Sequence, residues 1–528
     1  MSDQFSNLQQ IRKPANSSKG GIVAAQSRQA AETGAAVLAA GGDCVDAVIA
    51  TSFALGVLEP WMSGVGGGGA MVLYRAKEDR CEVIDFGTRA PLSLRVEDYP
   101  LTGGAASDIF PWPRVKDDRN IHGPGSIAVP GVVAGMAEAH RRHAKLPWRE
   151  LLGPSVTLAG EGLLVDWWTE HMIASAAADL RRYPASAAAY LQDGLPPNPQ
   201  WGIRSVVRLP QDKLKATLAH LASQGPRDFY QGDLARSIAA DVTASGGALS
   251  VEDLTSFGAH LREPLVIPYR GGKVYATPEL TSGPTLAHAL RLLQANLHPT
   301  RDPDASAYIN YALALQSAYR ERLQGMGDVD GRRGLGAEHL APSCTTHFSI
   351  VDREGNMAAV TQTLLSGFGS KFVTPLTGIT MNNGIMWFDP TPGTPNSLAP
   401  GKRCLTNYTP VVAQAADGSR LALGASGGRR ILPSVTQILS FVMDNGMDLD
   451  AAIHQPRIDA SEGAIVIGDV RLPGEVREAL RSRFDYEEAR IQTIPGKFAC
   501  PSLVLRNGTT NSGVTDPAQP WGDAVAEG

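Results

Sequence analysis

A hairpin near residue 350 shows the clearest pattern of apolar and polar positions in the chain. Residues 347–351 predict one β-strand and 357–363 the returning strand, because the intervening Asp-Arg-Glu-Gly-Asn has the composition of a turn. Cys344, Thr345 and Thr346 stand immediately before the first strand, and each has a side chain that can act as a nucleophile. Such residues usually lie at strand edges or in turns, so this pattern alone assigns them no chemistry.

Other segments repeat the periodicities of strands and helices along the chain. Strands are predicted at 21–25, 70–74, 81–86, 269–275, 378–383, 411–414 and 421–424. Helices are predicted at 30–40, from 44 onward after the capping residue Asp43, at 132–143, within 209–256, after 284 and at 432–444. The first 20 residues are polar, and 322–343 predicts a loop. The sequence contains no internal repeat and no long linker.

A glycine-rich run from Ser63 to Gly69 invites comparison with phosphate-binding loops. The P-loop requires a Lys followed by Ser or Thr after its glycines, and Ala70-Met71 follows here. The four consecutive glycines 66–69 instead predict a close approach of backbone to backbone before a buried strand. The run is therefore interpreted as a packing feature rather than a phosphate site.

Composition and charge exclude several classes of function. The 528 residues are 43% hydrophobic and 19% charged with a net charge of −5, so bulk charge recruits neither nucleic acid nor an anionic membrane. The five cysteines are scattered singly, without a Cys-x-x-Cys pair or a His-paired metal spacing. We therefore expect neither a metal, a cofactor nor a complete disulfide framework.

The chain shows no recognisable targeting segment. Its N-terminal residues, Met1 to Pro14, contain no apolar core of the kind found in signal peptides. No later run approaches the ~18 apolar residues of a membrane span. The simplest prediction is a cytoplasmic protein with no membrane partner.

The hairpin and several distant motifs resemble the γ-glutamyltransferase family. The run from Cys344 to Asp352, followed by Gly355-Asn356 and 361–363, is similar to the processing site of that family. The family pattern of Glu-Pro followed by Ser-Gly-x-Gly-Gly-Gly-Gly is matched at 59–69, and 513–517 is also family-like. The resemblance extends over most of the chain, with its motifs far apart and in order.

The resemblance implies that the precursor cuts itself between Cys344 and Thr345, and that the new N-terminal Thr345 is the nucleophile. A Thr hydroxyl is a weak nucleophile at neutral pH, but a free α-amine titrates near ~8 and can accept its proton. An internal Thr has an amide nitrogen in that place, so the uncut chain is expected to be inactive. Cys344 is the rival nucleophile, since thiols also serve this role.

The resemblance also implies the fold, which is α+β: a four-layer αββα sandwich of the N-terminal-nucleophile hydrolase type. Residues 1–344 would form the large subunit and 345–528 the small subunit. The two fragments are expected to remain an intertwined heterodimer because strands of both build the same sheets, and a dimer of these heterodimers stays open. The expected partner is a small-molecule amide, with no nucleic acid.

Further parts of an amide-cleaving site are implied by the match to the family. Gly427 and Gly428 correspond to its Gly-Gly oxyanion hole, although such a pair also occurs in a plain turn before a helix. Thr363 corresponds to a Thr that hydrogen-bonds the hydroxyl of the nucleophile. Thr406 and Asn407 stand where the family places two serines near the substrate carboxylate, and both retain hydrogen-bonding groups.

The residues that would hold a γ-glutamyl group depart from the family pattern. Gly87 stands where the family has the Arg that binds the glutamate α-carboxylate, and Arg89 lies two residues further on. Leu365 and Gly384 replace two polar anchors, and Trp387 replaces the Asp that pairs with the α-ammonium. Loss of a charge partner in a desolvated site costs roughly 2–5 kcal/mol, so glutathione is not expected to be a good substrate.

Two other departures affect access and charge. Only 397–399 separates the segments 392–396 and 400–403, where many γ-glutamyltransferases carry a longer lid. An open site favours hydrolysis over transfer. Arg429 follows the oxyanion glycines in place of a small residue, and it is interpreted either as an anion-binding residue or as a surface residue at a helix start.

This set of departures resembles a side branch of the family that includes oxamate amidohydrolase of purine-ring catabolism, cephalosporin-type acylases and glutathione-hydrolase-like proteins. The leading hypothesis is a self-processing amidohydrolase that cleaves a small carboxylate-bearing amide such as oxamate through an acyl-enzyme. Its substrate-binding residues would be Arg89, Trp387, Thr406, Asn407 and Arg429. The alternatives are a γ-glutamyl hydrolase or transferase with rebuilt substrate anchors, a cephalosporin-type acylase, and an unprocessed scaffold. The intact matches to the family's catalytic residues argue against the scaffold.

Overall fold

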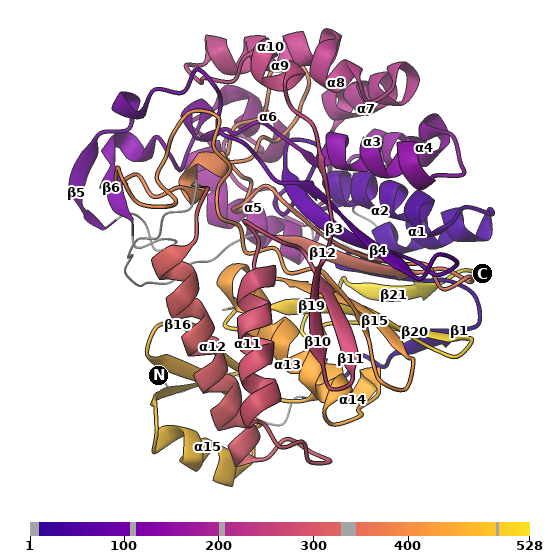
Figure 1. Ribbon diagram of the computed structural model, residues 1–528. Coiled ribbons are helices and arrows are strands. Elements are labelled where there is room, and N and C mark those ends of the chain that lie inside the picture. Colours follow the sequence, from indigo (N-terminus) through magenta and orange to yellow (C-terminus); the bar gives the residue numbers. More distant parts are fainter. Residues whose placement is uncertain (1–9, 106–111, 200–205, 329–344, 493–495) are drawn as a thin grey trace.

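Two seven-stranded antiparallel sheets lie face to face, and helices cover the outer surface of each (Figure 1). The computed structural model describes residues 10–105, 112–199, 206–328, 345–492 and 496–528. Its layers follow the order helix, sheet, sheet, helix. The predicted α+β fold with four αββα layers is therefore confirmed.

The first sheet contains the central hairpin. Its strands are, in spatial order, β21 (Asp523–Ala526), β2 (Ile22–Ala25), β12 (Thr346–Val351), β13 (Met357–Thr363), β3 (Gly68–Arg75), β4 (Arg80–Phe86) and β9 (His260–Arg262). The predicted hairpin is confirmed as β12 and β13, and β2, β3 and β4 confirm the predicted strands at 21–25, 70–74 and 81–86. Strands from both sides of the expected cut thus alternate within one sheet.

The second sheet has the spatial order β1 (Asn16–Ser18), β20 (Thr510–Thr515), β19 (Cys500–Asn507), β15 (Arg420–Ser426), β14 (Val411–Gln414), β11 (Gly272–Ala276) and β10 (Leu265–Tyr269). The predicted pair at 411–414 and 421–424 is confirmed as β14 and β15. The prediction of one strand at 269–275 is wrong, because Arg270 and Gly271, with φ of 50° and 74°, turn the chain between β10 and β11.

The predicted strand at 378–383 is also wrong. Its residues form only isolated bridges, Thr380 to Val373 and Met381 to Gly66. Asn382 Nδ2 instead donates to the carbonyls of Gly66 at 2.7 Å and of Ala128 at 2.8 Å. The segment therefore ties loops together, and an Asn side chain supplies the bonds that a sheet neighbour would have made.

Helices of the first half of the chain are α1 (Arg28–Ala39), α2 (Cys44–Leu58), α3 (Val132–His143), α4 (Trp148–Glu161), α5 (Trp167–Leu180), α6 (Pro184–Tyr190), α7 (Asp212–Gln224), α8 (Asp228–Gln231), α9 (Asp233–Ala244) and α10 (Val251–Thr255). All of these except α5 and α6 pack on the outer face of the first sheet. α1 and α3 confirm the predicted helices at 30–40 and 132–143, and α7 to α10 confirm helical structure within 209–256.

Helices of the second half cover the other sheet. They are α11 (Gly283–Asn296), α12 (Ala305–Gly325), α13 (Ile431–Met443), α14 (Leu449–His454) and α15 (Gly474–Arg481). Beside them lies a small sheet of β16 (Ile458–Glu462), β17 (Ile465–Asp469) and β18 (Asp485–Ala489). The predicted helices after 284 and at 432–444 are confirmed as α11 and α13.

Short elements complete the description. Two further strand pairs are β5 (Leu101–Ala105) with β6 (Pro113–Val115) and β7 (Leu163–Leu164) with β8 (Arg208–Leu209). The 3₁₀-helices are η1 (Val96–Asp98), η2 (Lys116–Asp118), η3 (Pro124–Ser126), η4 (Gly384–Trp387) and η5 (Gly428–Arg430). Among the described residues, no helix has the length and apolarity needed to cross a membrane. The described cysteines, Cys44, Cys81, Cys404 and Cys500, are unpaired.

Side chains of successive strand residues enter different cores, because their directions alternate along a strand. In β2, Val23 and Ala25 pack against the helices, whereas Ile22 and Ala24 pack between the two sheets. Every one of these side chains is fully buried. An apolar run without polar alternation is therefore the expected signature of an inner strand in this fold.

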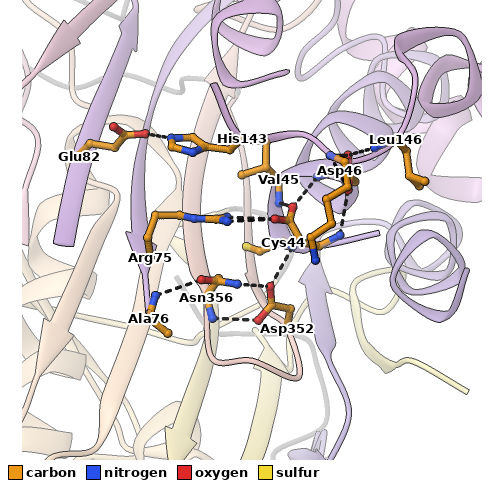
Figure 2. Close-up of polar contacts among 12 residues, drawn as sticks. Cys44, Val45, Asp46, Arg75, Ala76, Glu82, His143, Leu146, Asp352 and Asn356 are labelled. Carbon is orange, nitrogen blue, oxygen red and sulfur yellow. Dashed lines mark hydrogen bonds and ion pairs between the residues drawn. The ribbon is translucent and has the colours of Figure 1, made fainter. Parts of the chain in front are cut away.

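The turn of the central hairpin is fixed by a polar cluster at the end away from Thr345 (Figure 2). Asp352 accepts the Asn356 N–H at 2.8 Å, and its other oxygen accepts the Cys44 N–H at 3.1 Å. Asn356 Oδ1 in turn accepts the Ala76 N–H at 3.0 Å. The hairpin is thereby attached to the start of α2 and to the end of β3, which sets the position of its other end.

Asp43 begins α2 in the predicted way. Its side chain accepts the N–H of Asp46 at 3.4 Å, and its own N–H donates to Asp46 Oδ2 at 2.9 Å, which forms a capping box. Arg75, at the end of β3, donates to the second Asp43 oxygen at 3.1 Å. The cap therefore also joins the helix layer to the sheet (Figure 2).

The predicted loop at 322–343 begins inside a helix. α12 continues to Gly325, and Arg322 is only 3% exposed. The buried face of this helix carries Tyr308, Tyr311 and Leu315, and the same spacing of three or four residues leads on to Arg322. The charge of Arg322 hides this continuation in the sequence, and 329–344 lies outside the described residues.

Candidate active site

Thr345 lies directly before β12 and faces Thr363 at the end of β13. The two hydroxyl oxygens are 3.5 Å apart, with Thr345 donating, and Thr363 Oγ1 accepts the Leu365 N–H at 2.7 Å. The antiparallel register produces this pairing, because Thr346 is opposite Gln362. The structure thus brings together the two predicted threonines, while Cys344 lies outside the described residues.

His347 belongs to the packing of the two sheets. Its Nδ1 lies 2.9 Å from Thr361 Oγ1 and its Nε2 lies 3.0 Å from Ser349 Oγ. Burial lowers the pKa of His347 to about 3, so its imidazole stays neutral. A Cβ on Gly424 would lie 2.3 Å from His347 Cε1, so β15 approaches β12 this closely only because residue 424 is glycine.

The turn after β15 contains Gly427 and Gly428. Their φ angles of 131° and 63° favour glycine, and their N–H groups precede α13, where a helix provides no intrahelical acceptor. Gln26 Nε2, directly after β2, donates to Ser426 Oγ at 2.6 Å. Since β2 pairs with β12, this contact places the glycine turn at the end of the sheets where β12 begins. Two N–H groups at such a turn can stabilise an oxyanion.

Glu59 is a buried acid beside the Thr pair. It follows α2 and is 3% exposed, and its Oε2 accepts the Thr346 hydroxyl at 3.1 Å. Its Oε1 has no hydrogen-bond partner in the described part of the chain. Burial raises the pKa of Glu59 to about 8, and the Thr346 hydrogen bond offsets only part of this effect. The carboxyl group is therefore mainly protonated at neutral pH.

Replacing Glu59 is expected to change how stability depends on pH. The folded chain holds the Glu59 proton up to about pH 8, whereas the ordinary pKa of a Glu carboxyl is 4.5. The stabilisation of the fold by protonated Glu59 is therefore complete below the lower pKa, that of the unfolded chain. It is lost as the pH rises through the higher pKa, that of the folded chain. Between pH 5 and 8, the free energy of unfolding should fall less in Glu59→Gln than in the parent, by on the order of 4 kcal/mol.

Urea titrations at several pH values measure this difference in a Thr345→Ala background, which is expected to stay a single chain. Glu78→Gln is the matched control because Glu78 is exposed. It should show the parent's pH dependence. Equal pH dependence of the Glu59→Gln and parent proteins would contradict a raised pKa for Glu59.

Trp387 supports the loop that follows Thr363. Its indole Nε1–H donates to the Leu365 carbonyl at 3.2 Å, and the side chain is 4% exposed. Leu365 has φ of 80°, a left-handed backbone that is unfavourable for Leu by roughly 1–2 kcal/mol. The Leu365 N–H thereby reaches Thr363, so Trp387 and the strained loop together fix the Thr363 hydroxyl.

Thr406, Asn407 and Arg429 are buried and meet around the end of α12. The Thr406 hydroxyl donates to the Leu280 carbonyl at 3.1 Å. Tyr319 of α12 donates its hydroxyl to the Arg429 carbonyl. Arg429 is 7% exposed, so it is not a surface residue, and that interpretation of its position is wrong.

The Arg89 guanidinium is turned toward α10. It donates to the Asp253 carbonyl at 3.0 Å and to Ser256 Oγ at 2.8 Å, and it lies 5.7 Å over the Phe257 ring. These contacts occupy donors that a substrate carboxylate would need. A role for Arg89 in substrate binding stays a prediction, and its present contacts favour a role in attaching α10.

The sequence analysis assigns no chemical role to Glu59 or Arg322, yet both are buried ionisable residues that contact the site. A signal for each is present in the sequence. Glu59 ends a strongly apolar helical segment, and Arg322 stands three residues after Tyr319 on an apolar helix face. A charged residue at such a position points to a function or to an internal partner.

Comparisons with known proteins identify the relatives of this chain. A family model described as gamma-glutamyltranspeptidase matches residues 30–337 and 332–526. The acylase ACY 1 proenzyme of Pseudomonas sp. strain V22 is 33% identical, over 89% of this chain and 88% of that protein. The glutathione hydrolase proenzyme of Bacillus subtilis strain 168 is 30% identical, over 83% of this chain and 80% of that protein.

A solved structure has a similar fold. The cephalosporin acylase from Bacillus halodurans superposes with a TM-score of 0.84 at 25% identity. The match covers 100% of this chain and 99% of the other. The layers described above are thus those of the acylase.

Proposed function

The chain belongs to the gamma-glutamyltranspeptidase family, and on that premise we propose that it is a self-processing amide hydrolase with Thr345 as its nucleophile. The contact between Thr345 and Thr363, with the glycine turn at the same end of the sheets, carries the proposal. Cleavage would give fragments 1–344 and 345–528. These would stay together, because β12 lies between β2 and β13 in one sheet.

Maturation would proceed by attack of Thr345 Oγ1 on the carbonyl carbon of residue 344. The C–N bond breaks, and the hydroxyl proton passes to the leaving nitrogen, which becomes the α-amine of Thr345. Water then hydrolyses the ester that has formed, which leaves a carboxylate on residue 344. The uncut chain thus lacks its catalytic base until the peptide bond is broken.

In turnover, the α-amine takes the proton of Thr345 Oγ1 while this oxygen attacks the substrate's amide carbonyl. The N–H groups of Gly427 and Gly428 would stabilise the oxyanion, and Thr363 would orient the attacking oxygen. The leaving amine takes the proton from the α-amine. Water hydrolyses the acyl-enzyme, again with the α-amine as the base.

The substrate we propose is a small amide with a carboxylate and without an α-ammonium group, such as oxamate. Support comes from Trp387, since an apolar, buried indole occupies the position of the acid that would pair with an ammonium. Thr406, Asn407 and Arg429 provide polar and cationic groups for a carboxylate. A guanidinium can bind a carboxylate through two parallel hydrogen bonds.

A second candidate is the removal of an acyl group from a cephalosporin-type amide. The 33% identity to an acylase proenzyme and the TM-score of 0.84 to a cephalosporin acylase favour it. The 30% identity to a glutathione hydrolase proenzyme supports a third candidate, γ-glutamyl hydrolysis. All three reactions use the same nucleophile and differ in what the acyl pocket accepts.

A panel of oxamate, a glutaryl amide and γ-glutamyl anilide separates these candidates. We expect kcat/KM to be highest for an acid without an α-amine and at least about tenfold lower for the anilide, since its ammonium lacks a partner. Trp387→Asp is the matched variant, and it should raise the relative activity on the anilide. A wild-type enzyme that prefers the anilide would overturn the proposed specificity and leave the nucleophile unaffected.

A further inference from the structure

α12 presents two polar side chains, Tyr319 and Arg322, to the region of the predicted substrate site. They lie three residues apart and therefore point from one face of the helix. Tyr319 donates its hydroxyl to the Arg429 carbonyl, and Arg322 donates from Nη2 to the Thr406 carbonyl. One helix face thus holds both the segment after the glycine turn and the Thr406–Asn407 pair.

Every hydrogen bond that the Arg322 guanidinium forms with the described residues is to a neutral oxygen. Nη2 also donates to Asn407 Oδ1 at 3.3 Å, and Nη1 donates to the Thr281 carbonyl at 2.9 Å and to Thr285 Oγ1 at 3.4 Å. Within the described part of the chain, no Asp or Glu forms an ion pair with it. A buried guanidinium without a counter-ion is costly, which calls for an explanation.

The charge of Arg322 persists at neutral pH. Burial, together with the nearby positive charge of Arg429, lowers the pKa of Arg322 to about 10, and the group therefore stays protonated. Burial, and after it the charge of the nearby Asp459, raises the pKa of Tyr319.

We infer that Arg322 is a positioning residue that makes the Thr406–Asn407 segment a carboxylate site, with the substrate's own carboxylate as the missing counter-ion. The inference rests on the proposed function. Arg322 donates to the Thr406 carbonyl and to the Asn407 amide oxygen, and these bonds orient the Thr406–Asn407 segment for a ligand. Its charge lies beside that segment and favours an anionic ligand over a neutral one of the same shape.

Oxamate and oxamide provide the test, because oxamide replaces the carboxylate with a neutral amide of similar size. For Arg322→Gln, we expect kcat/KM for oxamate to fall about 10- to 50-fold, mainly through KM, because a positive charge near the bound carboxylate is lost. For oxamide, kcat/KM of Arg322→Gln should stay within about twofold of the wild-type value. Arg322→Lys keeps the charge and should keep the preference for oxamate.

Tyr319→Phe is the matched control, since it removes a hydrogen bond on the same helix face without changing charge. It should affect both amides equally. Equal losses on both amides in Arg322→Gln would overturn the inference and assign Arg322 a purely structural role. If Arg322→Gln does not fold, a folded Arg322→Lys that loses the preference would overturn it as well.

Anion binding separates this inference from the proposed function. The melting temperature of the mature wild type should rise with malonate and not with malonamide, and Arg322→Gln should lose this rise. A wild type that cleaves no carboxylate-bearing amide would overturn the proposed function, and malonate would still test Arg322. Equal stabilisation of wild type and Arg322→Gln by malonate would overturn the inference about Arg322.

Discussion

Thr345→Ala is expected to leave the chain as one uncut polypeptide without amidase activity. The substitution removes the oxygen that would attack the carbonyl of residue 344, and it also removes the nucleophile of turnover. We expect kcat to fall by at least about 10⁴-fold, the scale seen when a nucleophile is removed. A denaturing gel measures cleavage, and release of the amine from the preferred amide measures turnover.

Three variants separate the possible nucleophiles. Thr345→Ser retains a hydroxyl and should still be cut. Cys344→Ala removes the rival thiol and should leave both cleavage and turnover within a few-fold of the wild type. Thr346→Ala removes the hydroxyl that donates to Glu59, and it tests whether this neighbouring Thr acts as the nucleophile in place of Thr345. Cleavage of Thr345→Ala with loss of cleavage in Cys344→Ala would move the nucleophile to the thiol.

Gly428→Pro is expected to lower kcat by about 10²–10³-fold, the usual loss for one oxyanion donor. Proline has no N–H, so one of the two donors at the glycine turn disappears. Its φ is also fixed near −65°, whereas Gly428 has φ of 63°, so the turn itself must change. The measurement is kcat of the processed protein, with circular dichroism to show that it is folded.

Gly428→Ala separates loss of the donor from distortion of the turn. It keeps the N–H and can adopt the left-handed backbone at a cost of roughly 1–2 kcal/mol. It should therefore lose much less activity than Gly428→Pro. Gly427→Ala should also lower activity, because its Cβ would lie 2.9 Å from Ala499 Cα. Full activity of a processed Gly428→Pro would place the oxyanion hole elsewhere.

Local patterns explain the parts of the fold that were predictable. The hairpin of β12 and β13 has two β-forming runs on either side of a turn of Asp, Gly and Asn, and α3 begins and ends where its periodicity does. The capping role of Asp43 follows from the apolar helix behind it. Each of these features depends on residues close together in sequence, so one segment is enough to reveal it.

The remaining features depend on contacts between distant segments. The failed strand at 378–383 is held by side-chain bonds of Asn382 to two loops, which no local pattern encodes. The position of the Gly427–Gly428 turn, at the end of the sheets where β12 begins, follows from the stacking of two sheets. Arg322 shows the same limit, because its charge indicates exposure until the contacts with Thr406 and Asn407 are known.

The central claim is that Thr345 becomes the N-terminal residue of a processed enzyme. Sequencing the N-terminus of the smaller fragment of the purified wild type tests it most directly. We predict two bands on a denaturing gel and a smaller fragment that begins Thr-Thr-His-Phe, from Thr345 onward. A fragment that begins at Cys344, or a single full-length band from an active preparation, would contradict the claim.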